Sequence, residues 1–300
     1  MILRNFIITL PSIIYHSTLS AISKKKHGTK DNIIFNQTET DNLLLLVHGY
    51  HGHPCNFNPL INNMCSTKPN LKNEWNIVAI NLNQYENYTE NTVQNEANIV
   101  LDYIRNCKKT NIVLVGLSKG GLVCTTAYSI DPNLITKVIT ISSPLRGTRS
   151  CDLYLPKILD LINGNLDYVR NDLGFGSSTS CNTLNILANV NDCHNKIYHI
   201  VPTYDHMIYP EDAAKYPFTK PENVYTYYSL AYSHNGIPFN KEIADVITKW
   251  LKFDQETYDE SKPVSLSSLS SMSSSSSSSS SSTLSYSSSS SSSFSQSSSL

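Results

Sequence analysis

The sequence predicts an α/β fold in which helices flank a mostly parallel β-sheet. Short apolar runs typical of buried strands alternate along the chain with longer segments of helical periodicity. Because parallel neighbours need a crossover connection, this alternation favours a parallel sheet with right-handed crossovers. The chain has 300 residues. About 255 of them precede a serine-rich end, which is enough for one large α/β domain.

Six apolar runs are predicted to form the strands. The first, residues 42–47, is continuously apolar, as expected for a strand covered on both faces. The remaining five strands are predicted at 75–82, 112–115, 137–142, 196–201 and 224–230. Helices are predicted at 56–66, 91–107 and 241–252, and directly after residue 118.

Three regions are predicted along the chain. Residues 1–40 are an N-terminal extension, residues 41–255 the α/β domain, and residues 256–300 a serine-rich tail. Serine occupies 28 of the last 40 positions. Such a tract has almost nothing to bury, so we expect it to be disordered.

The first 22 residues leave three interpretations open. Arg4 and the apolar run 6–15 resemble the start of a signal peptide, but the run also suits an N-terminal element of the fold or a membrane-surface anchor. It is too short to span a bilayer as a helix. The compartment stays open, with a slight preference for the cytoplasm and with secretion if residues 1–20 are a signal peptide.

Composition argues against two classes of function. The net charge is −1 and there is no long basic run, so the chain lacks the electrostatic footprint of a nucleic-acid binder. His48, His51 and His53 lie close together, but no carboxylate or cysteine at ligand spacing accompanies them. We therefore expect no metal and no cofactor.

The cysteines favour reduced thiols. Their number is odd and no C-x-x-C motif occurs, which indicates neither a zinc site nor a complete disulfide framework. Cys181 and Cys193 would pair only in an oxidising compartment. The seven positions are Cys55, Cys65, Cys107, Cys124, Cys151, Cys181 and Cys193.

The most informative motif is G-L-S-K-G at residues 116–120. It follows an apolar strand and opens a helix, which is the context of a nucleophile elbow. Gly116 and Gly120 allow the sharp turn that holds Ser118 in a strained conformation. The helix N-terminus beneath Ser118 favours a developing negative charge. The alternative is an ordinary glycine turn between a strand and a helix.

Residues 42–252 resemble an α/β-hydrolase of the lipase type. Three segments carry the resemblance: LLLLVHGYHGHPCNF for the first strand and oxyanion loop, VGLSKGG for the elbow, and ITISSPLRGT at 139–148. Leu117 stands where many lipases have histidine, a minor departure. Neither its side chain nor that of Lys119 is required by the mechanism that the resemblance implies.

A set of catalytic roles follows from the motif, the strand positions and the resemblance. In this fold the order along the chain is Ser, then Asp or Glu, then His, and catalytic groups follow the carboxyl ends of strands. Ser118 is therefore the predicted nucleophile, Asp205 the acid and His234 the base. The resemblance implies that the backbone N–H groups of Tyr50 and Lys119 form the oxyanion hole.

Other residues compete for two of these roles. Asp172 and Asp192 are alternative acids that lie in the long connection before the fifth strand. His206 is a poorer base than His234 because it directly follows Asp205 in sequence.

The connection between the fourth and fifth predicted strands is unusually long, at about 50 residues. It contains two helix candidates, 152–162 and 182–189. A connection of this length is often an active-site lid, so we predict a helical lid at 149–195 that sets acyl preference. The alternative is that its apolar residues only pack it onto the sheet.

The sequence therefore predicts a serine hydrolase that cleaves carboxylic esters of lipids or other acyl compounds. A thioesterase or an acyltransferase would use the same triad, and a non-catalytic scaffold used for binding is the rival from another class. The expected partner is a small acyl ester or lipid, with membrane-surface contact as a further option and no nucleic acid. The oligomeric state is left open.

Overall fold

The structure is a computed structural model that describes residues 31–50, 52–82, 92–149, 171–203, 205, 207–227 and 234–252. The chain divides into two units, residues 1–255 and 256–300, and every element described below belongs to the first.

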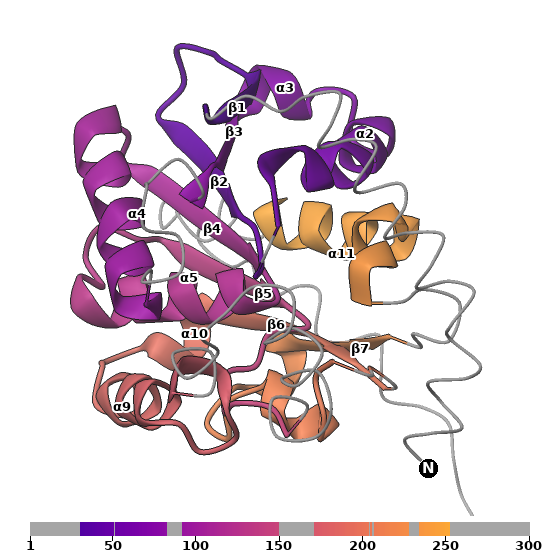
Figure 1. Cartoon of the computed structure of the whole chain (residues 1–300). Coiled ribbons are helices and arrows are strands. Elements are labelled where there is room, and N and C mark those ends of the chain that lie inside the picture. The colour runs from indigo at the N-terminus through magenta and orange to yellow at the C-terminus, as the bar shows by residue number, and fades with distance from the viewer. Residues whose placement is uncertain are drawn as a thin grey trace, which may run out of the picture. The chain divides into compact units, whose positions relative to one another are not determined.

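A seven-stranded sheet runs through this unit in the order β1-β3-β2-β4-β5-β6-β7 (Figure 1). All neighbouring strands are parallel except β1 and β3, which pair antiparallel. The strands are β1 (Ile33–Asn36), β2 (Asn42–Val47), β3 (Asn76–Ile80), β4 (Asn111–Leu117), β5 (Lys137–Ile141), β6 (Ile197–Pro202) and β7 (Val224–Tyr227).

Helices cover both faces of the sheet. The α-helices are α2 (Asn58–Thr67), α3 (Leu71–Glu74), α4 (Val93–Cys107), α5 (Lys119–Ile130), α9 (Ser178–Leu187), α10 (Cys193–Lys196) and α11 (Lys241–Lys252). Short 3-10 helices are η1 (Pro54–Phe57), η4 (Glu211–Ala214), η5 (Pro221–Asn223) and η7 (His234–Phe239). Figure 1 shows α4 and α5 on one side of the sheet and α2 and α11 on the other.

The continuous apolar run of β2 follows from this three-layer arrangement. Leu43 and Leu45 pack into the core beneath α4 and α5, whereas Leu44 and Leu46 pack into the core beneath α2 and α11. All four side chains are almost completely buried. Successive side chains of a strand point to opposite faces, so a strand covered on both faces needs apolar residues at every position.

The six predicted strands are present, with ends that shift by a few residues. The seventh strand, β1, was not predicted, and it extends the sheet into the predicted N-terminal extension. Ile34 is exposed and the other three residues are only partly buried, and the register with β3 is irregular after Ile34, so β1 lacks a strong strand pattern. For the last predicted strand, residues 228–230 lie outside the described residues.

The long connection after β5 is described from residue 171 onwards. Helix α9 replaces the predicted helix 182–189, and the predicted helix 152–162 lies outside the described residues. Helix α9 packs against α5, where the hydroxyls of Thr126 and Thr183 are 3.0 Å apart. The end of the connection is therefore anchored on the flank of the sheet, and the lid as a whole stays a prediction.

The described cysteines are free thiols, including Cys181 and Cys193. Burial raises the pKa of Cys124 far above its ordinary value, so this thiol is held in its neutral form. None of the helices in the described ranges is both long and apolar enough to cross a membrane.

Candidate active site

The turn between β4 and α5 holds Ser118 in a strained conformation. Its φ is 56° and its ψ −127°, a region that residues other than glycine rarely occupy. The Ser118 N–H donates to the carbonyl of Ile141 at 2.9 Å, and its own carbonyl accepts from the N–H of Gly121 at 2.9 Å. Neighbouring backbone therefore fixes the turn on both sides, as the glycine spacing predicted.

The two motif glycines are required by close backbone contacts. A Cβ at Gly116 would lie 2.4 Å from the carbonyl oxygen of Gly120, and a Cβ at Gly120 would lie 2.1 Å from that of Val47. Both distances are far below any real Cβ contact. The elbow can thus fold back against its own helix and against the end of β2 only where these side chains are missing.

The loop after β2 reaches the candidate nucleophile. A Cβ built at Gly49 would lie 2.8 Å from Ser118 Cβ and 3.3 Å from Ser118 Oγ. The loop is held by the buried ring of His48, whose Nδ1 lies 2.9 Å from the Gly49 carbonyl and whose Nε2 accepts from the Leu82 N–H at 3.2 Å. His48 therefore orients the loop that carries Tyr50, in line with a structural role.

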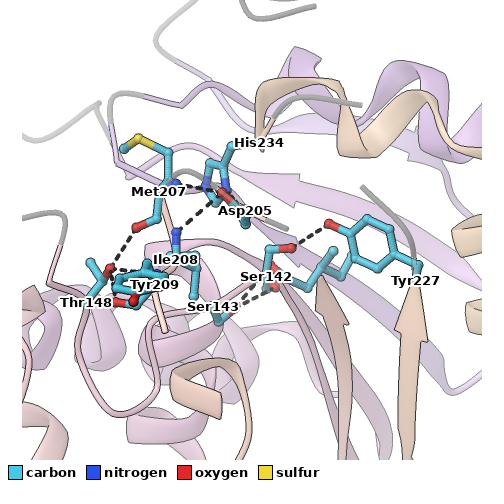
Figure 2. A network of polar contacts seen from close by, with 11 residues as sticks. Ser142, Ser143, Thr148, Asp205, Met207, Ile208, Tyr209, Tyr227 and His234 are labelled. Carbon is cyan, nitrogen blue, oxygen red and sulfur yellow. Dashed lines mark hydrogen bonds and ion pairs between the residues drawn. The ribbon is translucent and has the colours of Figure 1, made fainter. Parts of the chain in front are cut away.

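Asp205 and His234 form a buried pair at the carboxyl edge of the sheet (Figure 2). Oδ2 of Asp205 lies 2.7 Å from Nδ1 of His234. The other carboxylate oxygen accepts from the backbone N–H of Met207 at 2.7 Å and of Ile208 at 3.3 Å. The side chain of Asp205 is only 1% exposed, so these bonds define its orientation.

The second ring nitrogen of His234, Nε2, is buried and has no hydrogen-bond partner in the part of the chain that the structure describes. Ser118 therefore forms no hydrogen bond with Nε2 of His234, the contact that a catalytic triad would need. In the tautomer whose Nδ1–H donates to the Asp205 carboxylate, Nε2 carries the lone pair of the imidazole.

The alternative acids have other partners. Asp172 accepts from the Val93 N–H at 2.8 Å and from the Thr179 hydroxyl at 2.7 Å, so it caps helix α4. Asp192 binds the side-chain amide of Asn195. Of the three predicted acids, Asp205 is the one that meets His234. The competing base, His206, lies outside the described residues.

The buried hydroxyls of Ser142 and Tyr227 are a feature that the sequence did not reveal. Ser142 follows β5 with a φ of 45°, and its hydroxyl lies 2.7 Å from that of Tyr227 at the end of β7. Burial, reinforced by the carboxylate of Asp205, raises the pKa of Tyr227 well above its usual range. Its phenol is therefore neutral. Serine and tyrosine at strand ends signal such a pair only weakly, because the partner is far away in sequence.

A second missed feature is the side chain of Lys119. Its Nζ lies 2.7 Å from Oε1 of Glu96, and the two side chains are only 5% and 3% exposed. Burial raises the pKa of Glu96, the Lys119 ammonium opposes this rise, and Asp172 adds to it. The resemblance implied a role only for the backbone N–H of Lys119, whereas its side chain joins α5 to α4 through this ion pair.

The described residues contain no group of three histidine, cysteine or acidic side chains placed to hold a metal ion.

Comparisons with known proteins define the class of the fold. Residues 37–155 match a family model described as "Putative serine esterase (DUF676)". The structure is similar to the lipase BlEst2 from Bacillus licheniformis in its mature form, with a TM-score of 0.56 and 16% identity, over 74% of this chain and 98% of that one. The chain therefore has the fold of the α/β-hydrolases.

Two further solved structures show the same fold at low identity. MGS-MChE2, an α/β-hydrolase from a lagoon-sediment metagenome, gives a TM-score of 0.53 at 14% identity, over 75% of this chain and 95% of that one. Naproxen esterase from Bacillus subtilis gives 0.50 at 14% identity, over 73% and 86%. No curated protein matches the sequence.

Proposed function

We propose that this protein is a serine hydrolase that cleaves carboxylic esters with Ser118, His234 and Asp205. The observation that carries the proposal is the buried contact of 2.7 Å between Nδ1 of His234 and Oδ2 of Asp205. A strained serine follows β4 at the same edge of the sheet. The match of residues 37–155 to a serine esterase family model supports the same reaction class.

In the proposed mechanism, Ser118 Oγ attacks the ester carbonyl while its proton moves to Nε2 of His234. Asp205 holds the ring by Nδ1 and stabilises the imidazolium that forms. The backbone N–H groups of Tyr50 and Lys119 donate to the oxyanion. His234 then gives its proton to the leaving alcohol, and water releases the acyl group by the reverse transfers. Loss of one oxyanion donor would raise the barrier by about 3 kcal/mol.

The substrate within this class is proposed to be a lipid or another acyl ester. The support is the apolar side chains in the predicted lid, such as Ile158 and Leu159, which lie outside the described residues. Each methylene that such side chains bury adds about 0.8 kcal/mol to binding. On a series of p-nitrophenyl esters, Leu159→Asp should therefore reduce activity on long chains more than on acetate. Equal losses on both would remove the support for a lipid-like substrate.

A fluorophosphonate probe tests the proposed reaction directly, because it labels only an activated serine. The wild-type protein should be labelled and should hydrolyse p-nitrophenyl esters. Ser118→Ala should lose labelling, with a fall in kcat on the order of 10⁶-fold and an unchanged melting temperature. Ser129→Ala is the matched control, since Ser129 lies near the far end of α5 and its hydroxyl donates to the Thr126 carbonyl. It should behave as wild type.

One observation favours a non-catalytic scaffold, namely that Nε2 of His234 is not hydrogen-bonded to Ser118. The fluorophosphonate experiment distinguishes the hydrolase from the scaffold. A folded wild-type protein that neither reacts with the probe nor turns over esters would support the scaffold and contradict the hydrolase.

A further inference from the structure

The ion pair of Glu96 and Lys119 is deeply buried. It joins the first turn of α4 to the first residue of α5, and Lys119 directly follows Ser118. The whole residues Glu96 and Lys119 are only 2% and 4% exposed. The pair therefore lies within the protein interior and one residue from the candidate nucleophile.

Stability alone gives a poor reason for this pair. Moving two charges out of water is costly, and well-packed apolar side chains of similar volume are often equally stable or more stable. The cost is increased here because Oε2 of Glu96 is buried with no hydrogen-bond partner among the described residues. A directional hydrogen bond at this position therefore indicates a function that apolar packing would not provide.

The position of Lys119 suggests that role. Lys119 contributes its backbone N–H to the proposed oxyanion hole, and its side chain is fixed at its far end by the 2.7 Å bond to Glu96. Glu96 is itself held on a capped helix, because Thr92 accepts the Asn95 N–H and Asp172 accepts the Val93 N–H. The side chain of the residue that carries the N–H donor is thus tied to a helix end that is itself fixed.

We propose that Glu96 is a positioning residue for ester hydrolysis: its bond to the Lys119 ammonium holds the Lys119 N–H in line with the oxyanion. This inference rests on the proposed function. Glu96 contacts no reacting atom and acts through Lys119. An oxyanion donor works only in the geometry of the transition state, and a displacement of about 1 Å costs on the order of 100-fold in rate.

The test compares the single variants with an apolar double variant. Glu96→Gln or Lys119→Met alone leaves one buried polar partner unmatched, so both stability and kcat should fall. The double variant E96L/K119M removes both charges together, and its melting temperature should return close to that of wild type. If Glu96 positions the donor, kcat of this stable double variant should remain about 10- to 100-fold low with KM little changed.

A second readout separates positioning from general packing. A trifluoromethyl ketone forms a charged tetrahedral adduct with the nucleophile, so its affinity should fall in the double variant in parallel with kcat. The matched control is Lys137→Met, which also removes a buried lysine. The ammonium of Lys137 donates to the Trp250 carbonyl at 2.6 Å and lies at the start of β5, the opposite end from Ser118. This variant should lose stability while kcat and inhibitor affinity hold.

Two results would contradict the inference in different ways. If E96L/K119M turns over esters at the wild-type rate while Ser118→Ala is inactive, the proposed function stands and the positioning role of Glu96 is wrong. If the wild-type protein has no esterase activity and does not react with a fluorophosphonate, the proposed function fails, and the positioning role fails with it.

Discussion

The two edges of the same sheet use buried polar residues in opposite ways. At the amino edge, Asn76 donates to the carbonyls of Thr40 and Asn42 and accepts from the Thr38 N–H, all within 2.7–3.0 Å. At the carboxyl edge, Ser118 and Ser142 have positive φ angles, and Nε2 of His234 lacks a hydrogen-bond partner among the described residues. Hydrogen bonds at the amino edge hold the strands to their connections. The carboxyl edge instead contains strained backbone at Ser118 and a histidine nitrogen without a hydrogen-bond partner among the described residues.

This difference teaches where chemistry and stability reside in the fold. At the amino edge the buried side chain of Asn76 forms hydrogen bonds to part-buried backbone groups, so its loss should lower the free energy of unfolding. The separation is not complete. Lys108 and Asp192, which precede β4 and β6 at the amino edge, also have positive φ angles, and Oδ1 of Asn111 lacks a hydrogen-bond partner in the described ranges. Strain and an unpartnered base at the carboxyl edge lower stability and are expected where a site needs them.

The largest expected effect is on catalysis at the carboxyl edge. Asp205→Asn should keep the bonds from Met207 and Ile208 through its amide oxygen, so the fold should survive. The amide cannot stabilise an imidazolium and disfavours the required tautomer of His234, so kcat should fall by about 10⁴-fold. Ester hydrolysis and thermal melting of the purified variant measure the two effects.

The amino edge provides the contrasting variant. Asn76→Ala removes three hydrogen bonds to backbone groups, of which the Thr40 carbonyl keeps a second bond from Lys109 Nζ at 2.7 Å, so the change should cost about 2 kcal/mol of unfolding free energy, at about 1 kcal/mol for each of the two groups left without a side-chain partner, with kcat unchanged. Esterase activity within tenfold of wild type in Asp205→Asn, or a large loss of kcat in Asn76→Ala, would break the proposed division between the edges.

The second effect concerns close packing at the elbow. A Cβ at Gly120 would lie 2.1 Å from the Val47 carbonyl and 2.7 Å from the His48 carbonyl, both backbone atoms that cannot rotate away. Gly120→Ala should therefore destabilise the protein by about 3 kcal/mol or more and abolish activity. Gly176→Ala is the control, because its φ of 72° is strained but its Cβ meets nothing within 4 Å. It should cost about 1 kcal/mol and spare kcat.

Much of the fold could be predicted from local patterns, and the site only in part. The run 42–47 and the elbow motif at 116–120 each encode their structure within a few residues. Asp205 and His234 were assigned by their position after late strands, and in the structure Oδ2 of Asp205 lies 2.7 Å from Nδ1 of His234. The partners of Lys119 and Tyr227 escaped prediction because Glu96 and Ser142 are distant in sequence and only the folded chain brings them together. Strand β1 was not predicted because none of its four residues is fully buried.

A smaller effect concerns His199 and the pH dependence of stability. Unlike His234, this buried histidine has partners for both of its ring nitrogens. Nδ1 of His199 contacts the Thr140 hydroxyl at 2.8 Å and Nε2 contacts the Thr219 hydroxyl at 2.9 Å, so both nitrogens are occupied. Burial, with a smaller contribution from Lys215, lowers the pKa of His199 from 6.5 to about 3. The ring is therefore neutral in the folded protein, but in the unfolded chain it takes up a proton below pH 6.5.

Stability should consequently be complete above pH 6.5 and fall as the pH drops toward 3, by about 1.4 kcal/mol per pH unit. Between pH 6.5 and pH 5 this amounts to about 2 kcal/mol. Denaturant titrations of wild type and His199→Gln at several pH values isolate this contribution, since other titrating groups are shared. Parallel pH profiles for the two proteins would show that His199 is not held neutral by the fold.

The smallest expected effect concerns the hydroxyl pair of Ser142 and Tyr227 at the carboxyl edge. Tyr227→Phe leaves the Ser142 hydroxyl buried without its 2.7 Å partner, and Ser142→Ala does the same to Tyr227. Each single change should cost about 1.5 kcal/mol, mostly from the unmatched polar group, and the double variant should cost little more than either one.

Because Tyr227 lies near Asp205, kcat is the sharper measurement: a pair that only packs the carboxyl edge should leave kcat within about twofold of wild type. If the double variant instead loses the sum of the two single costs, the hydroxyls are not coupled. If kcat falls tenfold without loss of stability, the catalytic part of this edge extends to Tyr227.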